Sequence, residues 1–161
     1  MPSYKKLIPL QSKNTINIKN KKAYHDFEII EKFIAGIVLL GTEVKSVRMG
    51  KISLSDSYCY FIKNELFVRN MQIMEYAFAS FYNHAAGRER KLLLNRSELK
   101  RLERKVRETG LTIIPLRIFI NDKGLVKLEI GLARGKKLYD KRETIKLKDT
   151  KRQFERNQKL K

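Results

Sequence analysis

The stretch Ile113–Leu132, IIPLRIFINDKGLVKLEIGL, decides the fold because it places two apolar, strand-forming runs on either side of a polar turn. The runs are Ile113–Ile120 and Leu125–Leu132. Between them lies Asn121–Gly124, whose glycine suits a turn position with positive φ. Pro115 removes one backbone donor, so we expect an edge or a bulge there. The stretch therefore predicts an antiparallel hairpin.

Similar signals upstream predict the other strands. Leu54–Ile62 and Leu66–Ile73 flank the polar residues 63–65 and predict a second hairpin. Phe27–Leu40 predicts one long strand, bent at its glycine, and Thr15–Ile18 predicts a short one. These segments account for most of the regular structure that we expect.

Two helices are predicted between the strands. A short one of about two turns takes its N-cap from Gly41-Thr42 and ends at Gly50. A longer one begins at Asn95, with Glu98 completing a capping-box pattern, and ends at Gly110. The longer helix carries an apolar stripe of Leu99, Leu102 and Val106 and a basic face of Lys100, Arg101, Arg104, Lys105 and Arg107.

The order of these elements predicts a mainly β fold with peripheral helices. Short strands, one helix between the third and fourth of them and no βαβ alternation favour a small antiparallel barrel of the oligonucleotide-binding (OB) type. We expect this barrel over residues 14–139, after a flexible basic segment, 1–13, and before a basic tail, 140–161. A chain of 161 residues is long enough for one such domain.

The chain is strongly basic, with 36 Lys and Arg against 17 Asp and Glu and a formal net charge of +19. This disfavours an average metabolic enzyme and favours a polyanionic partner, either nucleic acid or an anionic membrane. A membrane is the weaker alternative because no long helix pairs the cations with a broad apolar face.

The excess charge lies in three segments. Residues 1–22 hold six basic and no acidic side chains, residues 88–107 nine against three, and residues 134–161 twelve against four. The rest of the chain has nine basic and ten acidic residues. Although a single charge run is usually only solvated, this distribution predicts a nearly neutral barrel with three basic segments.

The tail from Thr144 onward is poor in apolar residues. It therefore has too few apolar side chains to bury against the body and offset the entropy cost of ordering. We expect it to be disordered in isolation. Since it lacks Pro and Gly, it is free to become a basic helix on a partner.

The sequence lacks catalytic patterns. Its two histidines, His25 and His84, have no metal-ligand spacing, and neither a P-loop nor a GxGxxG pattern occurs. Asp26 could orient His25, but a surface histidine or one that contacts phosphate is the better interpretation. Cys59, the single cysteine, is best interpreted as a core thiol and excludes a disulfide framework. We expect no enzyme, no cofactor and no metal.

The same counts indicate a cytoplasmic protein. A single cysteine fits a reducing compartment. The N-terminal residues lack the apolar core of a secretory signal, and no apolar run approaches the roughly 20 residues of a membrane span.

Three short stretches combine the residue types that bind RNA: Asn20–His25, Gly87–Lys91 and Gly135–Arg142. Basic side chains neutralise phosphates, while aromatic rings stack on unpaired bases. Each stretch alone is compatible with a solvated loop. Together, around a neutral barrel, they favour RNA binding.

Several runs occur in the order and spacing of one known family. They are Asn20–Asp26, Ala35–Leu39 with Gly41–Ser46, Asp56–Tyr58, Arg90–Leu94, and Gly135–Lys137 with Tyr139–Glu143. Over residues 14–156 the chain thus resembles the SmpB (small protein B) family of bacterial tmRNA-binding proteins. One departure is Ile34, which stands where this family often has an acidic residue.

The resemblance implies a non-catalytic OB-like barrel that binds the tRNA-like domain of tmRNA and stands in for its missing anticodon arm. It would deliver alanyl-tmRNA to ribosomes stalled on non-stop mRNA, so that the nascent chain is tagged for degradation and the ribosome released. The implied tmRNA-binding residues are Asn20, Lys21, Lys22, Tyr24, His25, Arg90, Lys91, Leu93 and Asn95. From the residues alone, Leu93 is equally compatible with the core and Asn95 with the helix cap.

The resemblance also implies contacts with the small ribosomal subunit. Residues implied at the decoding centre are Gly135, Lys136, Lys137, Tyr139, Asp140, Lys141 and Arg142, with Tyr139 suited to stacking on a base. Residues implied in the mRNA channel, where the tail becomes helical, are Lys146, Lys148, Lys151, Arg152 and Arg156. Through the tmRNA complex the implied partners include elongation factor Tu and alanyl-tRNA synthetase.

We expect a monomer without a membrane partner. Two other functions stay open on the residues alone: a ribosomal or general RNA-binding module without tmRNA specificity, and an RNA-processing enzyme.

Overall fold

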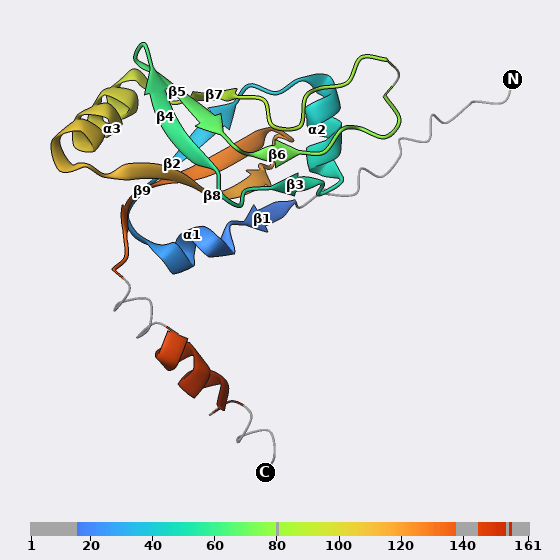
Figure 1. The fold of residues 1–161 in the computed structure, drawn as a ribbon. Coiled ribbons are helices and arrows are strands. Elements are labelled where there is room, and N and C mark those ends of the chain that lie inside the picture. The colour runs from blue at the N-terminus through green and yellow to red at the C-terminus, as the bar shows by residue number, and fades with distance from the viewer. Residues whose placement is uncertain (1–15, 80, 138–144, 154, 156–161) are drawn as a thin grey trace, which may run out of the picture.

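The computed structural model describes residues 16–79, 81–137, 145–153 and 155. Most of these residues belong to a strand-rich body with helices around it (Figure 1). The strands are β1 (Asn17–Lys19), β2 (Phe27–Ile37), β3 (Ile52–Ser53), β4 (Tyr58–Ile62), β5 (Glu65–Arg69), β6 (Gln72–Ile73), β7 (Arg90–Leu93), β8 (Thr112–Ile120) and β9 (Val126–Gly135). The helices are α1 (Lys21–Asp26), α2 (Gly41–Arg48) and α3 (Arg96–Thr109).

The main sheet closes into an antiparallel barrel. Its strand order is β1-β8-β4-β5-β7-β2-β9, and an additional pairing of β8 with β9 completes the ring. β4 joins β8 where Cys59 lies opposite Ile113, and β1 adds to β8 further along, where Ile18 lies opposite Ile118. A separate pair, β3 with β6, lies outside the ring. The predicted mainly β barrel with peripheral helices is confirmed.

Both predicted hairpins are present. β4 and β5 are joined through Lys63 and Asn64, which have φ values of 46° and 64°. Positive φ at two consecutive residues is typical of the tight turn that matches the twist of antiparallel strands. β8 and β9 are joined by a turn in which Gly124 has a φ of 76°.

A bulge in β8 changes which face of the strand its side chains occupy. The register with β9 shifts between Pro115 and Arg117, as the proline predicted. Ile113 and Ile118 lie in the barrel core, although their odd separation would place them on opposite faces of a regular strand. Ile114 and Leu116 face outward and are buried in a second cluster.

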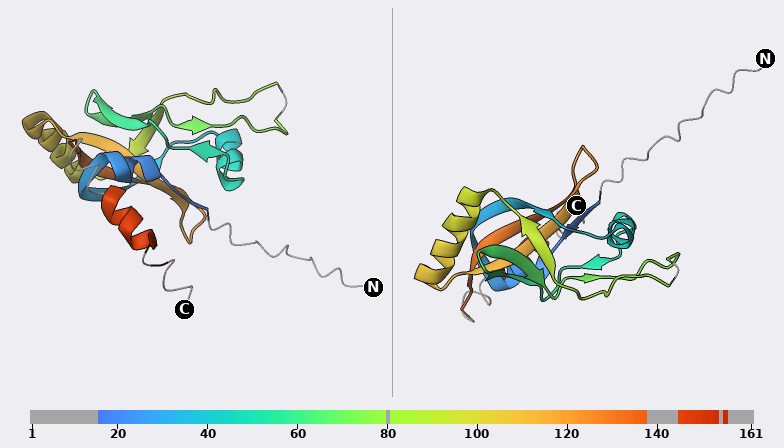
Figure 2. Two further views of the ribbon diagram at one scale, coloured as in Figure 1. Left: turned by 60° about the horizontal axis from the view of Figure 1, so that its bottom comes forward. Right: turned by 90° about the horizontal axis from the view of Figure 1, so that it is seen from above.

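The second cluster attaches α1 to the outside of the barrel. Ala23 of α1 packs with Ile114, Leu116 and Ala133, while Phe27 and Ile29 cover its edge. The views in Figure 2 show α1 lying along this outer surface. β8 and β9 are therefore buried on both faces, which explains their near-continuous apolar sequence.

The helices agree only in part with the sequence predictions. α3 begins after Asn95, whose backbone N–H donates to Glu98 Oε2 at 3.1 Å, and ends at Gly110 with a φ of 60°. The prediction that Gly41-Thr42 caps the short helix is wrong, because the N-cap of α2 is Leu40. α1 was not predicted as a helix.

The described part of the tail is helical, as we expect on a partner, and its predicted disorder in isolation stays a prediction. Residues 145–153 are helical, and the side chain of each is exposed. Lys, Arg, Leu and Ile there support a helix, while their exposure shows that no packing against the body contributes. Residues 1–15, 80, 138–144, 154 and 156–161 lie outside the described part, as do the proposed sites at Tyr139, Asp140, Lys141, Arg142 and Arg156.

The outer packing predicts a steric effect at Gly131. A Cβ at this position would lie 2.9 Å from Leu116 Cδ1 and 3.1 Å from Ile29 Cγ2. Because Leu116 is fully buried, it has little room to move. We expect Gly131→Ala to lower the free energy of unfolding by about 1–3 kcal/mol, measured by urea denaturation.

Gly135→Ala in the same strand is the control, since a Cβ added there would have no atom within 4 Å. Equal stability of the two variants would contradict the proposed close packing at Gly131.

Candidate nucleic-acid interface

Asn20 fixes α1 to the barrel. Its side-chain nitrogen donates to the carbonyl oxygens of Leu54 and Pro115 at 2.9 and 3.0 Å, and its Oδ1 accepts from Ala23 N at 3.1 Å. Its backbone N–H donates to Leu116 O at 2.7 Å. Asn20 thus caps α1 and ties it to β8 and to the loop before β4.

These bonds correct the prediction that Asn20 contacts RNA directly. The residue is buried, and its amide group is occupied by three intramolecular hydrogen bonds. Its position makes it a positioning residue for the exposed side chains that follow it in α1.

The other predicted residues of α1 are exposed. Lys21, Lys22, Tyr24 and His25 all reach the surface. His25 Nδ1 lies 2.9 Å from Asp26 Oδ1. The ring of Tyr24 has Lys32 Nζ at 5.4 Å from its centroid, which adds a cation to the same surface.

The hydrogen bond from Lys32 to the Tyr24 hydroxyl is the main cause that raises the pKa of this lysine, whose side chain is charged at neutral pH even without the shift. The surface around Tyr24 consequently remains cationic under ordinary conditions.

The end of β9 joins α1 on this surface. Lys136 N donates to Asp26 O at 2.9 Å, and Lys136 Nζ donates to Tyr24 O at 3.2 Å. Gly135 lies opposite Phe27 in the register of β2 with β9, while Lys137 is exposed just beyond. The structure therefore brings the predicted tmRNA and decoding-centre segments together, a contact across about a hundred residues that sequence spacing did not predict.

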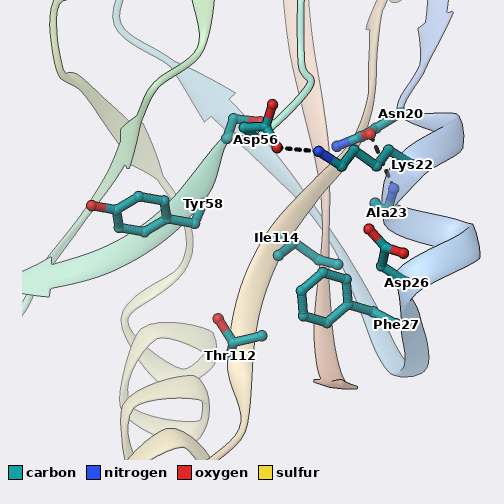
Figure 3. Close-up of a pocket in the computed structure, with 10 residues that line it drawn as sticks. Asn20, Lys22, Ala23, Asp26, Phe27, Asp56, Tyr58, Thr112 and Ile114 are labelled. Atoms are coloured by element: carbon teal, nitrogen blue, oxygen red, sulfur yellow. Dashed lines mark hydrogen bonds and ion pairs between the residues drawn. The ribbon is translucent and has the colours of Figure 1, made fainter. Parts of the chain in front are cut away.

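A cleft of about 360 Å³ lies between α1 and the loop before β4 (Figure 3). An ion pair between Lys22 and Asp56 spans its upper end in that view. The rings of Phe27 and Tyr58 line it, with Thr112 as one of its polar neighbours. Phosphates can bind such cations, and an unstacked base fits an aromatic wall. Asp56 and Tyr58 belong to the run that resembled the family, but their place beside α1 was not predicted.

Arg90 is the second predicted contact that the structure corrects. Its side chain is fully buried, and its Nε donates to Glu43 Oε1 at 2.8 Å. Arg88 Nη2 donates to the other carboxylate oxygen at 2.6 Å, and Leu40 N donates to the same atom at 2.7 Å. The remaining guanidinium nitrogens of Arg90 donate to the backbone carbonyl oxygens of Met71, Ala86 and Arg88. Arg90 is therefore structural and has no exposed donor for phosphate.

The Glu43 carboxylate stays ionised in this network. Burial acts to raise its pKa, but the hydrogen bonds from Arg88 and Leu40, with the charge of Arg90, outweigh burial and hold it below the usual value. Loss of the charge on either partner would leave the other charge buried and unpaired, which is strongly destabilising.

The remaining predicted residues lie elsewhere on the barrel. Lys91 forms an ion pair with Glu65. Leu93 is 52% exposed, so it is not a core residue, and Asn95 is exposed at the start of α3. Leu93 lies opposite Gly36, whereas α1 precedes Phe27 at the other end of β2. This separates Leu93 from α1 by about 30 Å along the strand.

Much of the central basic segment is balanced by acids. The basic residues between 88 and 107 that form ion pairs are Arg88, Arg90, Lys91, Arg101, Lys105 and Arg107. Glu31 of β2 binds both Arg101 and Lys105 of α3. The three predicted basic segments therefore remain basic by residue count, but in the central segment six of the nine basic side chains are already paired with acids.

Metal-ligating side chains do not cluster in the described residues. No group of three or more His, Cys, Asp or Glu side chains there could hold a metal ion. Burial raises the pKa of the Cys59 thiol, which makes it a weak nucleophile. Within the same part of the chain, no helix has the length and apolar character needed to cross a membrane.

A closed OB-like barrel with cations, an aromatic ring and a cleft on one face defines a small nucleic-acid-binding protein. A family model described as SmpB protein matches residues 17–160, and the chain belongs to the SmpB family.

Relatives and a solved structure agree with this family. The chain is 58% identical over 141 residues to an SsrA-binding protein of Phocaeicola vulgatus, covering 88% of this chain and 94% of the relative. It is 56% identical over 147 residues to an SsrA-binding protein of Christiangramia forsetii, covering 91% and 94%. A solved chain described as "tmRNA-SmpB: a journey to the center of the bacterial ribosome" has 46% identity and a TM-score of 0.65, covering 76% of this chain and 86% of that one.

Loss of the Asn20 side chain tests its positioning role. Asn20→Ala would leave the carbonyl oxygens of Leu54 and Pro115 without their donor, so we expect the free energy of unfolding to fall by about 2–4 kcal/mol. Lys21→Ala, on the exposed neighbour, should change it little. Urea unfolding of both variants measures this difference, and an unaffected Asn20→Ala would restore Asn20 as a candidate RNA contact.

Proposed function

We propose that this protein is a tmRNA-binding protein of trans-translation. It binds the tRNA-like domain of tmRNA, stands in for the missing anticodon arm and delivers alanyl-tmRNA to the A site of ribosomes stalled on non-stop mRNA. The nascent chain is then tagged for degradation and the ribosome released. The protein acts in the cytoplasm as a monomer and without catalysis, and elongation factor Tu and alanyl-tRNA synthetase meet it through the tmRNA complex.

The observation that carries this proposal is the contact between α1 and the end of β9. Lys136 binds the backbone of both Asp26 and Tyr24, so the α1 surface and the start of the C-terminal segment form one unit. Such a unit allows one small protein to hold tmRNA while its C-terminal segment reaches the decoding centre. Membership of a family whose relatives are called SsrA-binding proteins supports the same conclusion.

On the α1 surface, Lys21 and Lys22 bind phosphates while Tyr24 and His25 offer ring faces or a hydrogen bond. Lys22 exchanges its ion pair with Asp56 for a phosphate, which opens the upper end of the cleft in Figure 3. Leu93 and Asn95, at the other end of β2, form a second contact area for an extended RNA.

The C-terminal segment serves the small ribosomal subunit. The helix at 145–153 presents Lys146, Lys148, Lys151 and Arg152, all exposed, to the backbone of ribosomal RNA in the mRNA channel. Gly135, Lys136 and Lys137 lead into the decoding-centre contact, which continues into Tyr139 and its neighbours.

A gel-shift competition tests tmRNA specificity. The tRNA-like domain should displace a labelled copy of itself better than bulk tRNA or ribosomal RNA fragments do. Equal competition would favour a general RNA-binding module, and turnover of the labelled RNA would favour a processing enzyme.

Removal of both α1 lysines should weaken tmRNA binding. Because each neutralised phosphate releases a counterion, Lys21→Ala with Lys22→Ala should flatten the salt dependence of binding by up to about 1.8 in log–log slope. Gel shifts at several salt concentrations measure the slope.

The matched control is Lys100→Ala with Arg104→Ala on the exposed face of α3, which removes the same charge. An equal change of slope in the two variants would mean that only total charge matters and would remove α1 from the proposed interface.

Loss of the tail should separate tmRNA binding from the tagging of nascent chains on stalled ribosomes. Truncation after Tyr139 leaves every strand of the barrel in place, so we expect tmRNA affinity to stay within a few-fold while tagging of stalled nascent chains in a depleted extract is lost. A large loss of tmRNA affinity would contradict the division of roles.

A further inference from the structure

The loop between β6 and β7 exposes a group of aromatic rings that α1 and the tail do not involve. Phe78 is 78% exposed, Phe81 99% and Tyr82 93%, and Met74 nearby is 63% exposed. We call Tyr76, Phe78, Phe81 and Tyr82 the aromatic loop. It projects from the barrel beside α2, away from α1 (Figures 1 and 2). Large rings at this exposure contribute little to the core, and such a group is typical of a binding surface.

The base of the loop is held firmly. Asn83 Oδ1 accepts from Tyr76 N at 3.2 Å, and Asn83 Nδ2 donates to Tyr76 O at 3.0 Å. The buried ring of His84 lies 2.9 Å from Thr42 Oγ1 and 3.1 Å from Ile73 O through its two nitrogens. These bonds attach the foot of the loop to α2 and β6, so the rings are presented on a fixed support.

Cations accompany the rings. Lys45 Nζ lies 5.1 Å from the centroid of the Tyr76 ring, and Lys51 O accepts from Met74 N at 3.1 Å, which places this lysine beside the loop. Arg48, which lies between these two lysines in the sequence, is exposed on α2. The acids nearby are Glu75, which is exposed, and Glu43, which Arg88 and Arg90 neutralise inside the protein. The neighbourhood therefore carries more positive than negative available charge.

We propose that the aromatic loop and the exposed face of α2 bind unpaired RNA bases, as a further RNA site besides α1 and the contact area of Leu93 and Asn95. Bases stack on Phe81 and Tyr82, while Lys45, Arg48 and Lys51 lie where they neutralise the phosphates between them. The cation surplus favours a nucleotide strand over an apolar protein pocket, which would gain nothing from these charges. The inference rests on the proposed function only in taking RNA as the partner.

The test compares ring replacement with ring removal in the full chain. We would measure binding of a short fluorescein-labelled oligouridine by anisotropy. Phe81→Leu with Tyr82→Leu keeps apolar bulk but loses the flat faces, so affinity should fall at least about fivefold, since each stacked base is worth that much or more. Phe81→Tyr with Tyr82→Phe keeps the faces and should bind within about twofold of wild type. Wild-type affinity in the leucine variant would overturn the proposal.

Leu125→Ala is the control for lost apolar surface, because Leu125 is 54% exposed in the β8–β9 turn. It should leave oligouridine binding unchanged, and a loss equal to that of the leucine variant would also overturn the proposal. Failure of the proposed function is a separate result: it would show as no preference of the wild-type protein for the tRNA-like domain, whatever oligouridine binding does.

Photocrosslinking locates the contact. Oligouridine that carries thiouridine should crosslink to the tryptic peptide 70–88, which contains the whole aromatic loop and no internal Lys or Arg. Adducts on Phe81 or Tyr82 support the site, and adducts confined to other peptides overturn it.

Discussion

The fold depends on β8, because both faces of this strand are buried, one in the barrel core and the other against α1. One edge of this strand pairs with β9, and the other is shared by β4 and β1. Side chains on its inner face pack in the barrel core, while Ile114 and Leu116 on its outer face pack against Ala23 of α1. The bulge beside Pro115 makes both faces usable, because it turns Ile118 back into the core after two outward residues. Closure of the barrel and attachment of α1 thus come from one strand.

Buried polar side chains hold the helices in place and so determine which side chains of those helices are exposed. Asn20 holds α1 with three side-chain hydrogen bonds, and Glu43 with Arg88 and Arg90 holds α2 against the strand that follows the aromatic loop. Unpaired, each of these groups would be costly in the interior. Because they are satisfied, they act as rigid supports, and exposed neighbours such as Lys21 and Tyr24 are free to meet a partner.

The sequence predicts those parts of the fold that depend on residues close together in the chain. The two hairpins, the α3 cap at Asn95 and the bulge at Pro115 follow from turn, capping and proline chemistry within a few residues. Local pattern did not predict α1, because its cap Asn20 depends on carbonyl oxygens of Leu54 and Pro115 far along the chain. For the same reason the sequence predicts an RNA contact at Arg90 and gives no sign of its burial, since its partner Glu43 lies in a different element. The contact of Lys136 with α1 likewise depends on the whole barrel path.

The pairing of β2 with β9 also has a consequence for synthesis of the protein. Phe27 lies opposite Gly135, so most of β2, one of the first strands to leave a ribosome, waits for the last strand before it can pair, although its C-terminal end can already pair with β7. Native contacts so distant in sequence slow folding, and the waiting strands expose apolar surface. The barrel therefore closes only late in translation, and a copy whose own message breaks off before residue 126 would lack β9, the strand that pairs with most of β2 and closes the barrel against β8.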